Sequence, residues 1–152
     1  MTTQPVPSFD KNIQTKVKYY QGKKNVMSIY LDSTKAKEVY SFVNIDKFFT
    51  VYPDGGKLLN KALDKNLTRK VWDIAKDTPF ARENFSKYAN DSRYYCKFIL
   101  GDLPFAGIDF LIYDQTVALI QLEVNETIGV VIESKLMAEG LKAIHNTLWK
   151  LI

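Results

Sequence analysis

Two kinds of hydrophobic pattern alternate along this chain. Short runs rich in valine, isoleucine and aromatic residues predict strands, and segments whose apolar residues recur every three or four positions predict helices. Strands are predicted at Lys16–Tyr20, Glu38–Val43, Thr68–Ile74, Arg93–Ile99, Ile108–Tyr113, Val117–Leu122 and Ile128–Ile132. Helices are predicted at Lys23–Lys35, Ile45–Val51, Lys57–Asn66, from Asp77 to about Tyr88, and from Ser134 onward.

The order of these elements predicts an α/β fold with one mixed sheet flanked by helices. The early strands are separated by helices, which favours parallel neighbours, whereas the late strands are joined by short turns, which favours antiparallel ones. Residues 1–15 hold two prolines and little periodicity, so we expect a linker or tail there. Residues 16–152 are then expected to form a single domain.

The last helix carries one long apolar stripe. We predict that this stripe is buried, and that Leu148 and the adjacent Trp149 anchor the helix in the core. The helix also holds the chain's sole histidine, His145, for which an edge or surface position is expected rather than a role as general base. The stripe consists of Met137, Leu141, Ile144, Leu148 and Leu151.

Composition excludes several classes of protein. No apolar run approaches the ~18 residues that cross a bilayer. The amino terminus has neither the basic start nor the apolar stretch of a secretion signal. Cys96 is the only cysteine, so no internal disulfide forms. A cytoplasmic protein without contact to a membrane is the expectation.

The net charge of +4 is unevenly spread. Residues 1–70 hold 13 Lys and Arg against 6 Asp and Glu, whereas residues 71–152 hold 8 against 11. A basic half attracts phosphate, so direct nucleic-acid binding is one hypothesis. The basic residues are mostly single lysines spread over several predicted elements, which favours ordinary solvated surfaces instead.

The sequence lacks the common signatures of metal, cofactor and nucleophile sites. One histidine and one cysteine, 49 positions apart, do not build a zinc site. Gly55-Gly56 has neither the spacing of a phosphate loop nor that of a dinucleotide fold, and a GxSxG motif is absent. Neither a metal nor a cofactor is therefore expected. Asp109, Asp114 and Glu133 lie near predicted strand ends, where carboxylates act as acids and bases or, more often, cap turns and helices.

The chain resembles the phospholipase D-like domain of TrmB-type transcription regulators. The resemblance runs over residues 17–150 and rests on the order and spacing of several short pieces. These pieces are Val17–Gly22, Ala36–Asn44, Asp77–Glu83, Gly107–Tyr113, Asp114–Ile120, Ile128–Ser134, Met137–Leu141 and Leu148-Trp149.

Active relatives with this fold carry the motif His-x-Lys-x-x-x-x-Asp, in which the histidine attacks phosphate. With Asp114 as the aspartate, the histidine position falls on Gly107 and the lysine position on Asp109. Glycine has no nucleophile, and an aspartate repels phosphate. The resemblance therefore implies a non-catalytic domain with no catalytic residues; the alternative is a diverged phosphodiesterase or nuclease with a relocated site.

The resemblance also implies partners. TrmB-type proteins pair a DNA-binding winged helix with a sensor domain that binds a small effector, a sugar in the family's known cases, and that dimerises. This chain corresponds to the sensor part, and we expect DNA contact only through a winged helix, which the chain lacks. A homodimer is expected. The candidate effector ligands lie at strand ends: Asn44, Asp77, Asp109, Asp114 and Glu133.

Overall fold

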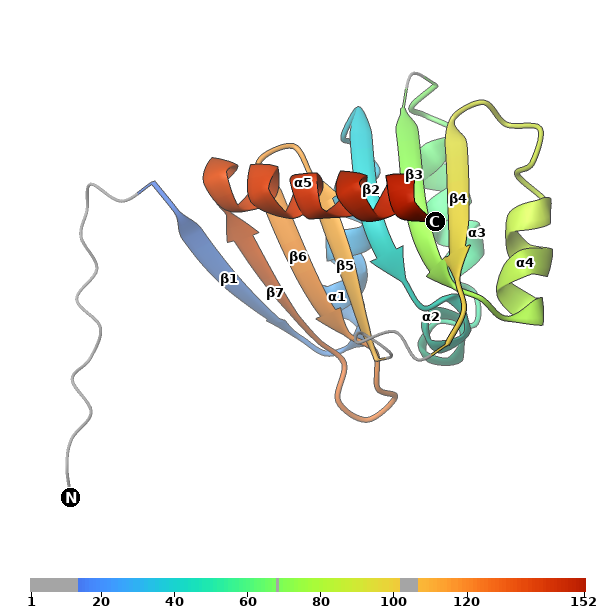
Figure 1. Ribbon diagram of the computed structural model, residues 1–152. Coiled ribbons are helices and arrows are strands. Elements are labelled where there is room, and N and C mark those ends of the chain that lie inside the picture. Colours follow the sequence, from blue (N-terminus) through green and yellow to red (C-terminus); the bar gives the residue numbers. More distant parts are fainter. Residues whose placement is uncertain (1–13, 68, 102–106) are drawn as a thin grey trace.

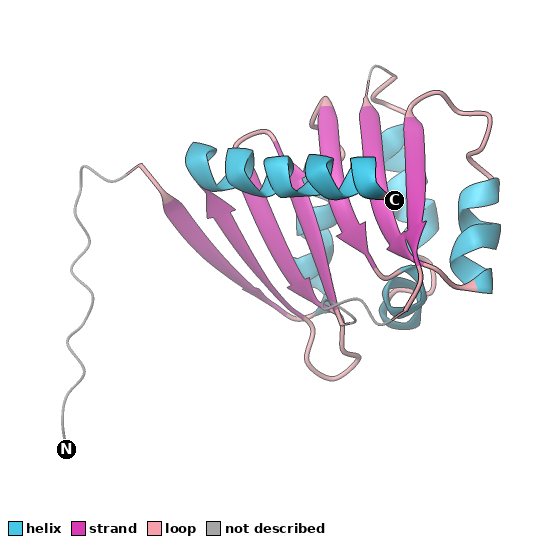
Figure 2. Ribbon diagram, viewed as in Figure 1, coloured by secondary structure: helices cyan, strands magenta, loops and turns pink. Residues whose placement is uncertain are grey.

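The computed structural model describes residues 14–67, 69–101 and 107–152. Within them, seven strands form one mixed sheet flanked by five helices, which confirms the predicted α/β class (Figures 1 and 2). The strands are β1 Lys16–Gln21, β2 Glu38–Val43, β3 Lys70–Lys76, β4 Tyr94–Ile99, β5 Ile108–Tyr113, β6 Thr116–Gln121 and β7 Ile128–Glu133. The helices are α1 Lys23–Ser33, α2 Ile45–Val51, α3 Gly55–Leu63, α4 Pro79–Ser86 and α5 Lys135–Leu151.

Most elements lie where the hydrophobic pattern placed them. The largest difference is in α3, which begins two residues earlier and ends three residues earlier than predicted, and β3 lies two residues later at both ends. Apart from residues 14 and 15, the predicted tail over 1–15 lies outside the described residues.

The strand order in the sheet is β1-β7-β6-β5-β2-β3-β4. β2, β3 and β4 are parallel, and the pairings from β1 across to β2 are antiparallel. A two-residue turn joins β5 to β6, and Asp114 at its first position adopts φ 53°, a left-handed conformation that aspartate tolerates better than most residues. The expected division into a parallel and an antiparallel part is confirmed.

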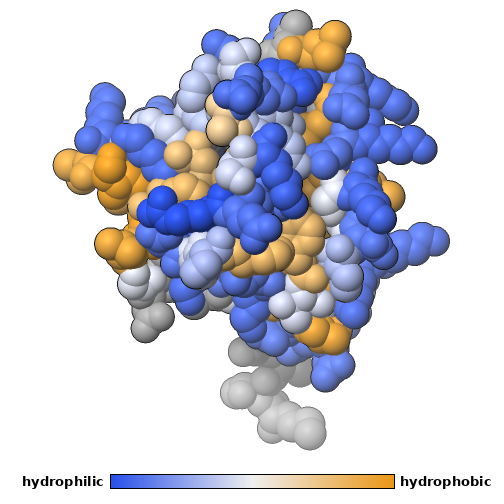
Figure 3. All heavy atoms as spheres, turned by 90° about the vertical axis from the view of Figure 1, so that its right-hand side faces the viewer, coloured by the Kyte–Doolittle hydropathy of each residue, from blue (hydrophilic) through white to orange (hydrophobic). Residues whose placement is uncertain are grey.

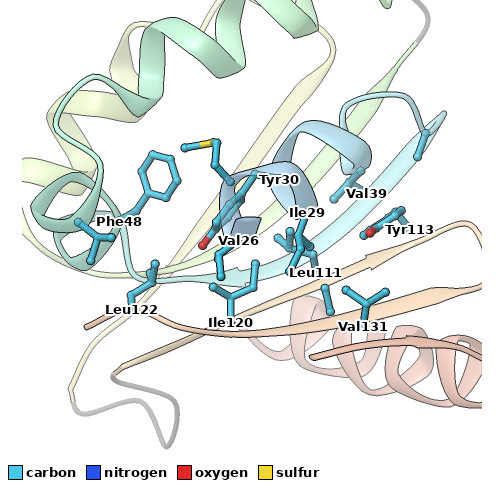
Figure 4. Close-up of a cluster of buried hydrophobic side chains, with 14 residues drawn as sticks. Val26, Ile29, Tyr30, Val39, Phe48, Leu111, Tyr113, Ile120, Leu122 and Val131 are labelled. Atoms are coloured by element: carbon cyan, nitrogen blue, oxygen red, sulfur yellow. The ribbon is translucent and has the colours of Figure 1, made fainter. Parts of the chain in front are cut away.

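The helices divide between the two faces of the sheet. α5 lies across one face, while α1 and α3 lie behind the other and α4 lies beside β4 (Figure 1). The main core fills the space between α1, α2 and the sheet (Figure 4). There Val26, Ile29 and Tyr30 of α1 pack with residues of the central strands such as Leu111 and Ile120, each at most 5% exposed.

The buried side of α5 differs from the predicted one. Ala138 and His145 are buried, at 3% and 0% exposure. Met137, Ile144 and Leu151 of the predicted stripe are instead 51%, 59% and 77% exposed. The prediction that this stripe forms the core contact of α5 is therefore wrong, and Leu148 and Trp149 are half-buried rather than core anchors.

An aromatic pocket on the sheet explains why a histidine occupies the centre of this contact. The rings of Tyr40 and Phe42 on β2 meet His145 edge to face, at centroid distances of 5.4 and 5.1 Å, and Trp149 stacks on it at 5.8 Å. His145 Nε2 lies 3.2 Å from the Ser41 carbonyl oxygen, which accepts a hydrogen bond from the ring. Burial lowers the pKa of His145, so the ring is neutral. The expectation of an edge or surface histidine is wrong.

We predict that His145→Ala lowers the free energy of unfolding by about 3 kcal/mol, because it opens a cavity between α5 and β2. For a domain of this size the melting temperature should fall by roughly 10 °C. Thermal unfolding followed by circular dichroism measures this. Asn146→Ala, on the exposed side of the same helix turn, should change stability by no more than about 0.5 kcal/mol. Equal effects of the two substitutions would contradict the packing of α5.

Candidate ligand-binding site

Three neighbouring strands at the centre of the sheet place polar side chains under the helices. Successive side chains of a strand point to opposite faces, and on the face opposite α5 the strands β2, β3 and β5 carry Ser41, Asp73 and Asp109. A cavity of about 140 Å³ lies between these strands and the helices α1 to α4. Its polar lining includes Tyr30, Ser33, Ser41, Asn60, Arg69, Asp73, Asn84 and Asp109, and its apolar walls include Phe48, Leu59, Leu63, Phe85 and Leu111.

Asp109 is 1% exposed and is held by two hydrogen bonds. The hydroxyl of Tyr30 on α1 donates to Oδ2 at 2.8 Å, and the backbone N–H of Asn44 donates to Oδ1 at 2.9 Å. Burial raises the pKa of Asp109 to about 7, the two hydrogen bonds oppose this rise, and the nearby charge of Asp73 adds to it. Asp109 therefore links α1, β5 and the start of α2.

Asp73 lies in the middle of β3 and is held by fewer hydrogen bonds than Asp109. The hydroxyl of Ser41 on the adjacent strand donates to Oδ1. Within the described residues, no donor reaches Oδ2. Burial raises the pKa of Asp73 to about 6, while the Ser41 hydrogen bond and the charge of Arg69 hold it down. Asp73 keeps some accessible surface because it faces the cavity.

Arg69 is the third charged group, and it is 6% exposed. Its Nη1 donates to the Ser33 carbonyl oxygen at 3.2 Å, whereas its Nε has no hydrogen-bond partner in the described part of the chain. Burial lowers the pKa of Arg69, but the guanidinium stays charged because its pKa is so high. Arg69 and Asp73 influence each other's pKa, yet among the described residues they form no ion pair within 4.0 Å.

A contact between two helices lies at the outer side of the cavity. The hydroxyl of Tyr88, which follows α4, donates to Asn60 Oδ1 on α3 at 2.8 Å, and this hydrogen bond is exposed to solvent. Both residues line the cavity. In α3 Gly55 and Leu63 are buried, whereas Leu58 is 50% exposed. α3 therefore covers the polar strands with little packing of its own.

The structure separates the five residues predicted to bind an effector. Asn44 and Asp109 meet at one end of the central strands, where the Asn44 side chain also caps α2. Asp77 follows β3 at the same end and pairs with Arg82 at 2.6 Å, and Thr78 rather than Asp77 caps α4. These three positions share one end of the sheet.

Asp114 and Glu133 lie at the opposite end of the strands, roughly 15–20 Å away for strands of this length. Asp114 forms the turn between β5 and β6, and Glu133 accepts a hydrogen bond from Lys18 at 2.9 Å, which lowers its pKa. One small ligand does not reach both ends. An effector role for any of the five residues stays a prediction, and Asp109 is the one that lines the cavity.

The sequence pattern did not single out Asp73, Arg69, Ser41 and Tyr30. A signal for Asp73 was present, because a charged residue interrupts the apolar run Val71-Trp72-Asp73-Ile74-Ala75 of a central strand. Tyr30 stands at helical spacing with Val26 and Ile29, which indicates a buried position but not a polar site. Arg69 and Ser41 gave no such signal.

The sole histidine and the sole cysteine do not line the cavity, whereas the hydroxyls of Ser33 and Ser41 do. Gly107 has no side chain, His145 is on the other face of the sheet, and burial raises the pKa of Cys96, which leaves its thiol protonated. Both carboxylate oxygens of Asp109 accept hydrogen bonds from the protein itself. In the described segments no three His, Cys, Asp or Glu residues gather in a way that suits a metal ion.

Comparison with known proteins identifies the fold. No family model matches the chain, and no curated protein matches it. Solved structures do: TrmBL2, described as an archaeal chromatin protein with a novel mode of DNA binding, is 18% identical with a TM-score of 0.60, over 93% of this chain and 54% of TrmBL2.

Two further structures share the fold. NucT from Helicobacter pylori is 12% identical with a TM-score of 0.62, over 90% of this chain and 97% of NucT. Phosphatidylserine synthase from Haemophilus influenzae Rd KW20 is 13% identical with a TM-score of 0.53, over 91% of this chain and 40% of the synthase.

The chain thus has a phospholipase D-like fold. The similarity to TrmB-type proteins read from the sequence is confirmed at the level of the fold by TrmBL2, of which the chain spans about half, 54%.

The buried carboxylates predict a pH dependence of stability. The pKa of Asp109 rises from 3.8 in the unfolded chain to about 7 in the folded one, so between these values the folded state binds more protons. The free energy of unfolding therefore falls as the pH rises from 4 to 7. Asp109→Asn should remove roughly 1–4 kcal/mol of this fall. Urea unfolding at pH 4.5 and pH 8 gives the fall in the free energy of unfolding for each protein. Subtracting one fall from the other removes the contribution of His145, whose lowered pKa acts in the opposite direction in both proteins. A fall of equal size in the variant would contradict the assignment.

Proposed function

We propose that this chain is a non-catalytic regulatory domain that senses a small molecule and dimerises. The proposal is carried by the resemblance read from the sequence, which aligns Gly107 and Asp109 with the histidine and the lysine of active relatives. Gly107 provides no nucleophile, and Asp109 is buried, hydrogen-bonded at both oxygens and negative or neutral where a phosphate-binding lysine would be positive. A domain that keeps the fold but lacks these catalytic groups can still bind a ligand.

We propose that any link to DNA runs through a larger assembly. TrmBL2 is described as binding DNA, and this chain spans 54% of it. We propose that the domain biases a DNA-binding unit by favouring one of two states when its ligand is bound. No helix in the described part of the chain is long and apolar enough to span a membrane.

We expect no hydrolysis of bis(p-nitrophenyl) phosphate above the buffer rate, with or without Mg²⁺, because neither a nucleophile nor a phosphate-binding cation stands at the catalytic positions. Release of nitrophenolate measures this. Turnover that is lost in Asp109→Asn or Cys96→Ser would overturn the regulatory proposal in favour of a diverged phosphodiesterase. Turnover retained in both variants and in His145→Ala would be traced to a contaminant by further purification.

The proposed dimer interface is one side of α5. All charged residues of this described helix lie on one flank, where Lys142 Nζ pairs with Glu38 at 3.3 Å. The opposite flank and outer side carry Leu136, Met137, Gly140, Leu141, Ala143, Ile144, Thr147, Leu148 and Leu151, none of them charged. Because Met137, Leu141, Ile144, Leu148 and Leu151 are spaced alternately by four and three residues, they form the seam of a helix pair.

This apolar surface suits a second copy of the chain. Figure 3 shows the molecule from the side on which α5 ends, with α5 toward the left. Orange apolar side chains stand out on that left edge, and others are scattered over the face. The apolar surface continues on the uncovered sheet beside α5, where Val17, Tyr19 and Ile108 are 66%, 62% and 39% exposed. The exposed parts add up to several hundred Å², on the order of the ~800 Å² per partner in a standard interface. The uncharged flank lets two identical helices meet without repulsion, and Gly140 permits close approach.

Light scattering at micromolar concentration should give a mass near twice 17.5 kDa. Ile144→Lys places a charge in the centre of the seam and should yield a monomer. Asn146→Lys introduces the same side chain two residues away on the charged flank and should leave the dimer intact. A wild-type monomer, or a dimer unaffected by Ile144→Lys, would remove α5 as the interface.

A further inference from the structure

The cavity under α3 contains polar groups that the protein itself leaves incompletely bonded. Arg69 Nε is buried and finds no acceptor among the described residues, whereas Asp73 Oδ2 receives no hydrogen bond there but keeps some accessible surface. Buried polar atoms are nearly always bonded, so the unbonded Nε beside the cavity points to a missing partner. Arg69 directly precedes β3, and Asp73 lies in the middle of that strand. Both side chains line the cavity and form no ion pair with each other, which leaves room for a molecule between them.

We propose that this cavity binds a small neutral polyol, a molecule of about six non-hydrogen atoms with hydroxyl groups on adjacent carbons, as the ligand of the sensor. The inference rests on the proposed regulatory function and deepens it by naming the ligand class.

The volume of the cavity limits the size of the ligand. An apolar cavity of about 150 Å³ holds benzene, and the present cavity measures about 140 Å³. Glycerol has the same number of non-hydrogen atoms as benzene, and a four-carbon polyol is slightly larger. A hexose has about twice as many and exceeds the space. The cavity therefore favours a shorter polyol over a hexose.

The arrangement of the walls selects hydroxyl groups. A hydroxyl both donates and accepts hydrogen bonds, so adjacent hydroxyls can donate to Asp73 Oδ2 and accept from the guanidinium of Arg69. Leu59, Leu63 and Phe85 line the remaining space and pack against the carbon chain. A polyol thus matches both the polar and the apolar part of the cavity.

The charges of the cavity favour a neutral ligand. Arg69 offsets the charge of Asp73, and Asp109 is already bonded at both oxygens. An anion would face two carboxylates, and a cation would face the guanidinium. A zwitterion would have to bring two full charges out of water into a buried space, which is strongly unfavourable. Hydroxyl groups avoid these penalties.

The cavity has a route for exchange with solvent. The exposed hydrogen bond between Tyr88 and Asn60 joins the end of α4 to α3, and α3 is fixed by few buried side chains. Elements with few buried contacts open with a small free-energy change. Breaking this hydrogen bond separates the helices above Asp73 and admits the ligand, and ligand binding then restrains α3.

The experiment is a titration of the full, ¹⁵N-labelled chain with glycerol, erythritol and glucose, followed by ¹H–¹⁵N correlation spectra. Glycerol and erythritol should give saturable shifts at amides around Ser41, Asn60 and Asp73, with dissociation constants of about 1–10 mM. Glucose should not. Saturation separates binding from the general effect of polyols as solvent additives, which grows with concentration without levelling off.

Two matched variants locate the site. Asp73→Asn turns the acceptor at Oδ2 into an amide and should weaken glycerol binding at least fivefold; it removes a buried carboxylate whose pKa is raised, so the protein should stay folded, which circular dichroism checks. Asp32→Asn makes the same change on the exposed side of α1, outside the cavity, and should leave binding within a factor of two. Equal loss in both variants, or none in Asp73→Asn, would contradict the site.

Ionic probes test the charge argument. Acetate, methylammonium and alanine at about 50 mM should neither shift these amides nor compete with glycerol. A saturable response to one of them in place of glycerol, binding of glucose at the same amides, or no saturable shift with either polyol would each overturn the inference. Phosphodiester turnover is an independent readout. If turnover appears, the proposed regulatory function is wrong, whatever the polyol titrations give. If there is no turnover and the titrations fail, only the polyol ligand is wrong.

Discussion

The carboxylate of Asp109 ties the fold together at its centre. It is 1% exposed and accepts one hydrogen bond from Tyr30 on α1 and one from the backbone of Asn44, between β2 and α2. A buried carboxylate is tolerated only when its oxygens are bonded, so α1, β5 and the β2–α2 connection must take up these positions together. The core of α1 and the sheet (Figure 4) packs around this point. Its pKa near 7 reflects the cost of burial that the two hydrogen bonds only partly offset.

The same constraint places a polar group beside the cavity. On the proposed alignment Asp109 stands where an active phospholipase D-like enzyme presents a lysine to phosphate, and the hydroxyl of Tyr30 donates a hydrogen bond to its carboxylate. Asp73, Ser41 and Arg69 continue the polar group along the adjacent strands, under a helix with few buried side chains. Polar residues at such positions weaken a core, and a ligand that completes their hydrogen bonds gives them a function.

α5 contacts the sheet through a different side than its apolar stripe suggests. His145 and Ala138 fix it to the sheet through a pocket of aromatic rings. The charged flank faces Glu38, whereas Met137, Ile144 and Leu151 of the stripe are exposed and Leu141 and Leu148 are half-buried. Because His145 rather than Ile144 is the buried residue, part of the stripe is exposed, and this exposed part is the proposed dimer interface.

The sequence by itself determined the elements, their order and the division of the sheet. These follow from local periodicity and from turn lengths, which act over a few residues, so Glu38–Val43 or Ile108–Tyr113 can be read without knowing their neighbours. The alignment of Gly107 and Asp109 with the catalytic pair of active relatives stays a prediction from the sequence. Tertiary structure alone decided which side of α5 is buried, because that depends on the aromatic rings of β2 some hundred residues away. It also decided that Asp73, Arg69 and Asp109 share one cavity, and that Asp114 and Glu133 lie at the far end, since such distances are set by strand register and packing rather than by position along the chain.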